Sequence, residues 1–340
     1  MDISVAVPAY NEEANIGLLI DTLRRQRLTR GRVVEIVVVA SDCTDRTVEI
    51  VRERARRPGT PVRLIEEPVR RGKVAAINTY LASLASVGRA RVGALCVCSA
   101  DLLVAPDTLA HLVARLDADP RIGMCGARPV PTNDPGSFLG EATRFLWNMH
   151  HRVAMESPKL GELVLVRAGI VDKLPPESMV DEASLEQMIR AAGYRLAYVP
   201  EAVVHNHGPE TVVDFVRQRR RIAAGHYWLA SVSGYRVSTM NLPRVVRLTL
   251  SELSRMEARS RTFAMGAIAL EGVARLLGFI DFKTDLEQHI AWKMSGTTKR
   301  VANDEVRALY FDGPGGDDRD ALIDGAGAQR PEAARQAAAS

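Results

Sequence analysis

Short apolar runs alternate in the first part of the chain with longer segments whose apolar residues repeat at helical spacing. The runs at residues 3–7, 33–40 and 92–98 are nearly continuous, as expected for strands that are buried on both faces of a sheet. The first of the helical segments carries its apolar stripe over residues 16–23. This alternation predicts an α/β fold.

Polar loops follow the predicted strands. The first strand stops at Pro8, whose fixed φ angle and missing amide hydrogen end it, and Asn11 is expected to cap the helix that comes next. The run at 33–40 ends in Ser41 and Asp42, and the run at 92–98 leads to Asp101. Because ligands of open α/β sheets bind at the carboxyl ends of the strands, these loops are expected to converge on one site.

A cationic turn precedes the helix that begins near residue 74. Arg70, Arg71 and Lys73 surround Gly72, which relaxes the turn. Lysine and arginine supply positive charge while the first amide groups of a helix supply donors, so the turn suits an anionic ligand. The alternative is a solvated, cationic helix start.

Apolar helices dominate the chain beyond residue 227. The segment 244–261 is amphipathic, and 263–280 is the most apolar stretch, although Glu271 and Arg275 stand one helical turn apart and are expected to pair. With these charges the stretch falls short of the roughly twenty uncharged residues that a bilayer crossing requires. The two helices are expected to dock on the α/β domain, to form a dimer contact or to lie on a membrane surface.

The composition indicates the size of the core, the kind of ligand and the cellular compartment. The 340 residues are 46% hydrophobic, which is enough to bury a large core, and a net charge of +4 fits anionic substrates or a membrane surface. Four cysteines without metal-binding spacing indicate reduced thiols and a cytoplasmic protein. Glycine, proline, alanine and charged residues dominate from Asp312 onward, which predicts a disordered tail over 312–340.

Four short motifs stand where predicted strands or turns lead into helices. They are VPAYNEE at 7–13, Gly72-Lys73 with Asn78, Ala100-Asp101 with PDTL at 106–109, and DEASL at 181–185. In this order they resemble the signature of family 2 nucleotide-sugar glycosyltransferases, and the resemblance runs from residue 3 to about residue 227. It implies a GT-A fold with a mixed, mostly parallel sheet flanked by helices. It also implies a nucleotide-diphosphate-sugar donor, Mg²⁺ or Mn²⁺, and transfer with inversion at the anomeric carbon.

The resemblance assigns the metal to Asp101. A divalent cation neutralises the charge that grows on the phosphate oxygens as the sugar leaves, and Mg²⁺ sites often use only one or two carboxylates. The family more often carries Asp-x-Asp here, whereas this chain has Ser99-Ala100-Asp101, so weaker metal binding is expected. His207, on the same strand face as His205, is a second candidate ligand. The alternative for Asp101 is a surface aspartate that ends a strand.

Donor contacts are implied at the strand-end loops, at the cationic turn and at a Gln-x-x-Arg element. The residues assigned to the donor are Pro8, Ala9, Tyr10, Glu12, Ser41, Asp42, Arg71, Lys73, Ala100, Gln218 and Arg221. The pair Ala40-Ser41 replaces the two adjacent aspartates that the family commonly shows. Ser41 or Asp42 is therefore expected to accept hydrogen bonds from the base, and the identity of the nucleotide stays open.

An arginine cluster at 217–221 lies on a predicted helix that starts near Thr211. Such a cluster suits phosphate, nucleic acid, an acidic membrane or solvent. Only 5% of the residues are aromatic and no base-stacking pattern surrounds the cluster, so nucleic acid is not expected as a partner. Ile222 replaces the tryptophan that usually follows the Gln-x-x-Arg element, which argues against a processive polysaccharide synthase.

The resemblance places the general base in the motif that begins at Asp181. Glu182 aligns with the base position and Asp181 with the acid before it, so the usual Glu-Asp order is reversed. A carboxylate there would take the proton of the acceptor hydroxyl while its oxygen attacks the far face of the anomeric carbon. The alternative is that Asp181 only caps the helix 182–192.

These features predict a cytoplasmic, metal-dependent, inverting glycosyltransferase of hexosyltransferase type that serves a cell-envelope glycan. Its GT-A domain is expected over residues 1–208 and an α-helical C-terminal module over 209–311. The expected acceptor is a hydroxyl on a glycan or on a lipid-linked molecule, with peripheral contact at the inner face of the membrane. Two other classes stay open: a sugar-nucleotide pyrophosphorylase, and a non-catalytic binder of anions or membrane surfaces.

Overall fold

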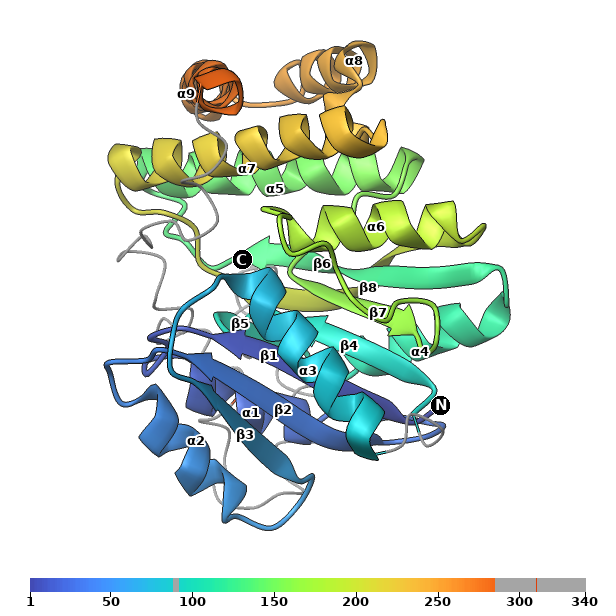
Figure 1. Cartoon of the computed structure of the whole chain (residues 1–340). Helices are drawn as coiled ribbons and strands as arrows, with labels where there is room; N and C mark the ends of the chain where they lie inside the picture. The colour runs from blue at the N-terminus through green and yellow to red at the C-terminus, as the bar shows by residue number, and fades with distance from the viewer. Residues whose placement is uncertain (88–91, 285–309, 311–340) are drawn as a thin grey trace, which may run out of the picture. The chain divides into compact units, whose positions relative to one another are not determined.

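One sheet carries the polar loops on which the predicted site depends. In a computed structural model that describes residues 1–87, 92–284 and 310, eight strands form the order β3-β2-β1-β4-β7-β6-β8-β5 (Figure 1). The strands are β1 (Ile3–Ala9), β2 (Val33–Ser41), β3 (Val62–Glu67), β4 (Ala94–Cys98), β5 (Leu102–Val104), β6 (Ile122–Pro131), β7 (Leu163–Arg167) and β8 (Arg195–Asn206). The pairs β1–β2, β2–β3, β1–β4 and β6–β8 are parallel, and β4–β7, β6–β7 and β5–β8 are antiparallel. The predicted α/β fold with a mixed, mostly parallel sheet is confirmed.

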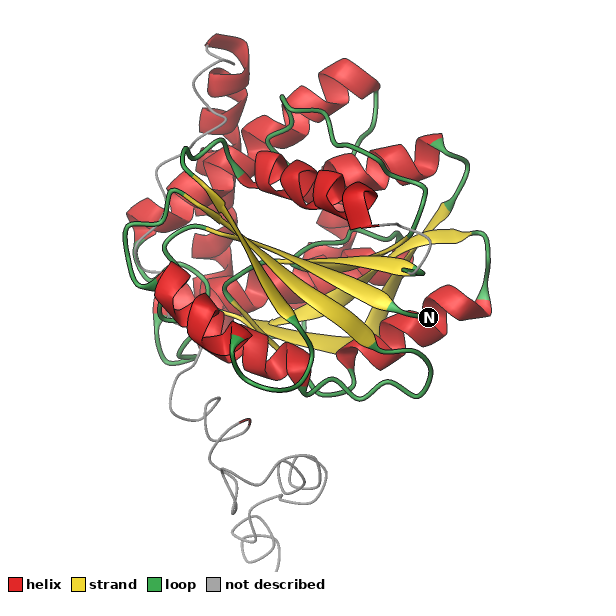
Figure 2. Cartoon of the chain, turned by 60° about the horizontal axis from the view of Figure 1, so that its bottom comes forward, coloured by secondary structure: helices red, strands yellow, loops and turns green. Residues whose placement is uncertain are grey.

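Helices cover both faces of this sheet (Figure 2). On one face lie α1 (Ile16–Arg24), α2 (Thr47–Ala55) and α4 (Thr108–Ala118), and on the other lie α3 (Lys73–Val87) and α6 (Asp181–Ala191). The alternation of β1 separates the two cores: Val5 and Val7 pack on the α1 side, while Ala6 packs on the α3 side. The carboxyl ends of β1 and β2 are thereby fixed from both faces.

Four further helices form a layer beyond the sheet. They are α5 (Phe138–Glu156), α7 (Val212–Ser233), α8 (Leu242–Leu253) and α9 (Ala258–Thr284), with the short 3-10 helix η2 (Ser238–Met240) before α8. Their shared core includes Phe145, Phe215, Leu248 and Ala267. In Figure 1, α8 and α9 are the outermost elements, above α7 and α5.

Ion pairs and a close backbone approach join α7 to α9. Arg219 Nε lies 2.6 Å from Glu271 Oε2, Arg275 Nε lies 2.7 Å from Glu271 Oε1, and Arg220 pairs with Asp281. The predicted Glu271–Arg275 pair is therefore confirmed. A Cβ atom added to Gly278 would stand 2.5 Å from the carbonyl oxygen of Arg220, so only glycine allows this approach.

Two local predictions at helix ends are wrong. Asn11 does not cap α1, whose N-cap position is Asn15. Asn11 instead has a φ of 52°, a left-handed conformation that asparagine tolerates, and its Oδ1 accepts a hydrogen bond of 2.8 Å from the amide of Thr44. That bond joins the loop after β1 to the loop after β2. The single amphipathic helix expected over 244–261 is interrupted between α8 and α9.

The apolar stretch of α9 is expected from the sequence to fall short of a membrane crossing, and the structure differs from this expectation. By length and composition alone the helix is long and apolar enough to cross a membrane, and 22% of its most apolar window is buried in this structure. Its two acidic residues in the described part, Glu271 and Asp281, both contact α7. These carboxylates therefore lie toward the protein, and the exposed residues between Met265 and Ile280 are apolar or small.

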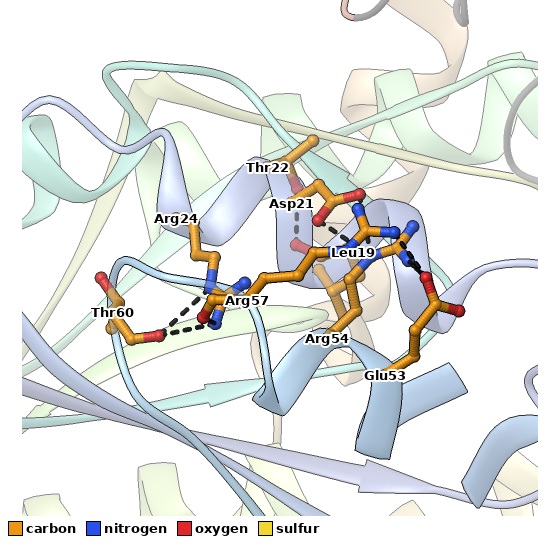
Figure 3. Close-up of polar contacts among 8 residues, drawn as sticks. All are labelled: Leu19, Asp21, Thr22, Arg24, Glu53, Arg54, Arg57 and Thr60. Carbon is orange, nitrogen blue, oxygen red and sulfur yellow. Dashed lines mark hydrogen bonds and ion pairs between the residues drawn. The ribbon is translucent and has the colours of Figure 1, made fainter. Parts of the chain in front are cut away.

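A largely buried ion pair links the helices that follow β1 and β2 (Figure 3). Arg54 Nε on α2 lies 3.0 Å from Asp21 Oδ1 and 3.1 Å from Asp21 Oδ2 on α1, so one donor is shared between the two carboxylate oxygens. Nearby, Arg24 Nε donates to the carbonyl oxygen of Thr60 at 3.1 Å. These charge-assisted bonds hold the two helices against each other.

The chain divides into two compact units, Met1–Val301 and Ala302–Ser340. The elements above all belong to the first unit. The boundary predicted near residue 208 falls inside that unit, so the separate helical module stays a prediction. The predicted disordered tail at 312–340 lies outside the described residues.

Candidate functional site

One cavity of about 740 Å³ brings together the residues predicted from distant motifs. Its lining includes Pro8, Ala9, Tyr10, Glu12, Ser41, Arg71, Lys73, Ala100, Asp101, Asp181, Glu182, His207, Gln218 and Arg221. Asp42 is the predicted residue that does not line it; the Asp42 amide donates to the Glu67 carbonyl at 2.8 Å, and its φ is 52°. The expectation that the strand-end loops converge is confirmed.

Lys73 lies at the centre of the ion pairs in this cavity. Its Nζ, at the start of α3, is 2.9 Å from Asp181 Oδ2 and 2.8 Å from Glu182 Oε1, and it donates to Ser99 Oγ at 3.1 Å. Asp181 is the first residue of α6 and the N-cap position belongs to Val180, so the helix-cap alternative for Asp181 is wrong. Lys73 thus holds both candidate bases.

The two carboxylates of this cluster have opposite pKa shifts. Burial and the charge of Glu182 raise the pKa of Asp181. Burial would also raise the pKa of Glu182, but the charge of Lys73 and hydrogen bonds from Asp181 and Lys73 lower it below its usual value. Glu182 is therefore the carboxylate that stays ionised, which is the state that a general base requires.

Asp101 lies between β4 and β5 beside a carboxylate that the sequence analysis missed. Glu162 precedes β7 with a φ of 63°, and its carbonyl oxygen accepts a hydrogen bond of 2.9 Å from the amide of Ser99. Burial and then the charge of Asp101 raise the pKa of Glu162 to about 8. In the sequence Glu162 is only a polar residue before an apolar strand, so no local signal marks it.

The donor atoms near Asp101 suit a hard cation. They are carboxylate and hydroxyl oxygens from Asp101, Glu162 and Ser99, and Mg²⁺ or Mn²⁺ sites prefer oxygen. Within the described ranges no group of three or more His, Cys, Asp or Glu side chains is arranged to hold a metal. A metal would therefore draw the rest of its coordination shell from substrate phosphates and water, as Mg²⁺ commonly does.

His207 makes its contacts with protein groups. Its Nδ1 is 3.0 Å from Thr132 Oγ1 and its Nε2 is 2.9 Å from Glu210 Oε1. Although His207 lines the cavity, these bonds occupy both ring nitrogens. Its role as a metal ligand stays a prediction that the observed contacts do not favour.

The end of β3 supplies a second residue that the sequence analysis missed. Glu67 is buried, and its carboxylate accepts hydrogen bonds from Ser41 Oγ at 2.6 Å and from Thr79 Oγ1 at 2.5 Å. Arg71 also contacts it at 3.3 Å. Two of the predicted donor residues, Ser41 and Arg71, are thus positioned by one carboxylate on a neighbouring strand.

The arginine cluster of α7 has two roles. Arg219 and Arg220 make the ion pairs to α9 described above. Gln218 and Arg221 line the cavity, as the Gln-x-x-Arg element predicts. Arg217, which also pairs with Asp214 at 2.9 Å, and Arg219 line it as well. The cluster is therefore partly a structural link and partly a cationic wall of the cavity.

An α/β sheet with acids and cations gathered at its strand ends is an arrangement that suits phosphate-bearing ligands. Comparison with known families identifies the class of protein. The model of "Glycosyl transferase family 2" matches residues 4–166, and that of "Glycosyl transferase family group 2" matches residues 96–277, more than half of the chain. The chain belongs to glycosyl transferase family 2, and the resemblance seen in its motifs is confirmed.

Individual relatives are distant. The chain is 24% identical to "Probable glycosyltransferase YdaM" of Bacillus subtilis over 247 residues, which cover 67% of this chain and 56% of that protein. It is 33% identical to "Undecaprenyl-phosphate 4-deoxy-4-formamido-L-arabinose transferase" of Pseudomonas aeruginosa over 113 residues, 33% of this chain and 32% of that protein. The chain thus matches little more than half the length of the first relative and about a third of the second.

A solved structure shares the fold. It is "Mannosyltransferase PcManGT from Pyrobaculum calidifontis in complex with GDP-Man and Mn2+", with a TM-score of 0.57 and 22% identity over 83% of this chain and 87% of that chain. At this identity the likeness establishes the GT-A architecture.

Proposed function

We propose that this protein is a metal-dependent, inverting glycosyltransferase that moves a sugar from a nucleotide-diphosphate donor to a hydroxyl acceptor. The observation that carries the proposal is the convergence of Asp101, Lys73, Glu182 and Arg221 on one cavity at the strand ends. These side chains come from four different elements, and family membership supports their combined use.

The donor diphosphate is proposed to lie between the strand ends and α7. Arg71 and Lys73 on one side, and Gln218 and Arg221 on the other, would contact its phosphates. Asp101 would hold Mg²⁺ or Mn²⁺, and this cation would neutralise the charge that develops on the leaving diphosphate. The name of the mannosyltransferase that shares the fold includes Mn²⁺ and GDP-mannose, which supports this arrangement.

Glu182 is proposed as the general base. The acceptor oxygen would attack the anomeric carbon from the side opposite the diphosphate, its proton would pass to Glu182, and the bond from the sugar to the phosphate oxygen would break. Asp181, whose pKa is raised, would position Glu182 through the shared contact with Lys73. One inverted glycoside and one nucleoside diphosphate result.

The acceptor is proposed to be a glycan or a lipid-linked molecule at the inner face of the membrane. One distant relative is named for transfer to undecaprenyl phosphate, and the outward side of α9 is apolar. A cytoplasmic location with peripheral membrane contact agrees with both observations.

Thermal unfolding in the presence of donors tests this proposal directly. A panel of UDP-, GDP- and dTDP-sugars is added with and without Mn²⁺, and one of them is expected to raise the unfolding temperature only when the metal is present. That donor is then used in a transfer assay, in which NMR of the product reports the anomeric configuration. Absence of metal-dependent stabilisation by every donor, or release of pyrophosphate in place of a nucleoside diphosphate, would contradict the proposal.

A further inference from the structure

The cavity continues from the polar strand ends into the helical layer. In the helical layer its walls include the apolar residues Met149 and Val153 from α5, Phe215 from α7 and Val245 from α8, beside the ion-paired residues Arg219, Glu271 and Arg275. A small polar acceptor would leave these walls in contact with water. An acceptor that also carries an apolar chain would bury them, which is favourable in proportion to the apolar area removed from water.

The far end of the cavity opens at the outer surface. Leu242 on α8 and Ile268 and Gly272 on α9 line the cavity. All three are also exposed, Leu242 to 68% and Ile268 to 38%. Residues that belong both to a cavity wall and to the molecular surface mark its opening. The opening therefore lies at α8 and α9, the outermost helices in Figure 1.

The surface around this opening is apolar. On α8, Val246 and Leu250 are exposed and follow Leu242 at four-residue spacing, so they share one side of the helix. On α9, Met265 and Leu276 are exposed as well. We call these five residues the outer apolar face. An exposed patch of this kind marks an interaction site for a protein or a membrane.

The charges around the outer apolar face favour a bilayer with anionic lipids. Arg255, Arg259 and Arg261 are exposed where α8 passes into α9 and outnumber the one exposed acid of that segment, Glu257. The acidic residues Glu271 and Asp281 of α9 point toward α7 and pair with its arginines. An amphipathic helix with an apolar outer side and a cationic border lies stably in the interface of an anionic membrane.

We infer that the acceptor is a long-chain lipid whose nucleophilic oxygen lies at Glu182 and whose chain leaves through the opening lined by Leu242, Ile268 and Gly272 into the membrane. This inference rests on the proposed function and specifies its acceptor. The nucleophile is an alcohol oxygen at the head of the lipid, in keeping with the hydroxyl acceptor of the proposed function. It forms a bond to the anomeric carbon as the bond to the donor phosphate breaks. Its proton passes to Glu182.

Photo-crosslinking of the full chain tests the route. The probes are hexadecanol and hexadecyl phosphate, each with a diazirine at the far end of the chain. Crosslinked peptides are expected from α8 and α9 around Leu242 and Ile268, and an alcohol probe with the diazirine next to its head group should label the region of Met179 and Glu182. Comparison of the alcohol with the phosphate tests the head group. Labels scattered over the surface would overturn the inference.

Gly272 allows the opening to be blocked without disturbing the fold. A Cβ atom added at this position meets nothing within 4 Å, so Gly272→Trp fills the opening rather than the core. We expect this variant to lose roughly tenfold or more of the crosslinking near Met179 and of transfer to long-chain acceptors. Ala269→Trp is the control, because Ala269 is exposed on the same helix and does not line the cavity. Equal losses in both variants would contradict the route.

Sedimentation with vesicles tests the membrane contact. The wild-type chain is expected to bind vesicles of phosphatidylglycerol and to bind phosphatidylcholine much more weakly. The double variant Val246→Glu, Leu250→Glu should lose this binding, whereas Val69→Glu, which changes an exposed apolar residue far along the chain, should keep it. Retention of binding by the double variant would contradict the role of the outer apolar face.

Metal-dependent hydrolysis of the donor separates this inference from the proposed function. Hydrolysis needs the donor and metal residues but no lipid. If hydrolysis occurs and the lipid probes fail to label the cavity, the lipid route is wrong while the transferase proposal stands. If the donor is neither bound nor hydrolysed, the transferase proposal itself is wrong. Ala269→Trp, outside the cavity lining, should hydrolyse the donor at the wild-type rate.

Discussion

The two ends of the cavity differ in how they are built. The end at the strands is formed by polar side chains on loops and in the first turns of helices, and Lys73 holds two of its carboxylates, Asp181 and Glu182. The end at the helices is formed mainly by apolar side chains on long elements, and ion pairs between α7 and α9 hold these elements together and also line the cavity. The first end therefore has the chemistry of a reaction, and the second has the packing of a binding wall.

The charged residues have different roles at the two ends. Around Lys73 the charges shift pKa values inside a cavity that must admit a substrate. Around Glu271 they compensate one another between packed helices. Substitutions at the strand end should change the catalytic rate and leave the folding stability unchanged. Substitutions at the helical end should lower the folding stability and leave the rate unchanged.

The largest effect is expected from Glu182→Gln. The amide keeps the shape of the side chain but cannot accept the acceptor proton, so kcat should fall by roughly a hundredfold or more. Glu177→Gln is the matched control, because Glu177 is exposed in the loop before α6. Steady-state kinetics and the unfolding temperature are measured for both. Normal turnover by the Glu182 variant would remove it from the reaction.

Asp101→Asn should have the next largest effect on the rate. Losing one of the few carboxylates at the metal position should lower transfer by roughly a hundredfold and weaken Mn²⁺ binding, which titration by electron paramagnetic resonance measures. Asp107→Asn serves as the control, since Asp107 is exposed a few residues further along. Unchanged Mn²⁺ affinity would show that Asp101 is not a metal ligand.

Glu271→Gln tests the helical end. Burial opposes the charge of Glu271, but Arg219 and Arg275 lower its pKa to about 2. A carboxyl group whose pKa is lowered by folding stabilises the folded state at pH values above its ordinary pKa of 4.5. This contribution is lost as the pH falls toward the folded-state pKa of about 2. The variant should lose about 3 kcal/mol of unfolding free energy at neutral pH, and less in acid. Urea unfolding at pH 7 and pH 3 measures the difference, and equal losses at both would refute the assignment.

Lys73→Met should lower the rate at neutral pH by about tenfold, less than Glu182→Gln or Asp101→Asn, yet it should have the clearest effect on the pH profile. Without the ammonium group the pKa of Glu182 should rise, because burial alone favours its neutral form. The acidic limb of the plot of kcat/KM against pH should therefore move to higher pH. Lys173→Met, at an exposed position, should leave the limb in place.

The strand-end half of the site could be predicted because its signals are local. A strand that stops at Pro8, a cationic turn around Gly72 and an acid after β4 each show themselves within a few residues. The partners of these residues could not be predicted in the same way. Lys73 and Glu182 are separated by 109 positions, and Glu67 and Glu162 join the site only through the pairing of β3 with β2 and of β7 with β4.

The helical half escaped prediction for a different reason. Apolar residues such as Met149, Phe215 and Val245 have the spacing of ordinary core residues, and nothing in a periodic pattern distinguishes a filled core from a hollow one. The split between α8 and α9 was missed as well, because the helical periodicity carries on across it. Only the relative placement of four helices creates the cavity.

The glycine at position 278 has a mechanical consequence. Since its helix touches the backbone of α7 at Arg220 and Ala224, with no side chain between them, the two helices have little freedom to slide or part there. Helix α8 is tied in turn to α5, because Glu252 contacts Arg152 and Asn148, and Arg247 pairs with Glu156. The helical wall of the cavity is therefore a stiff frame, which selects a guest by the width that the wall already has.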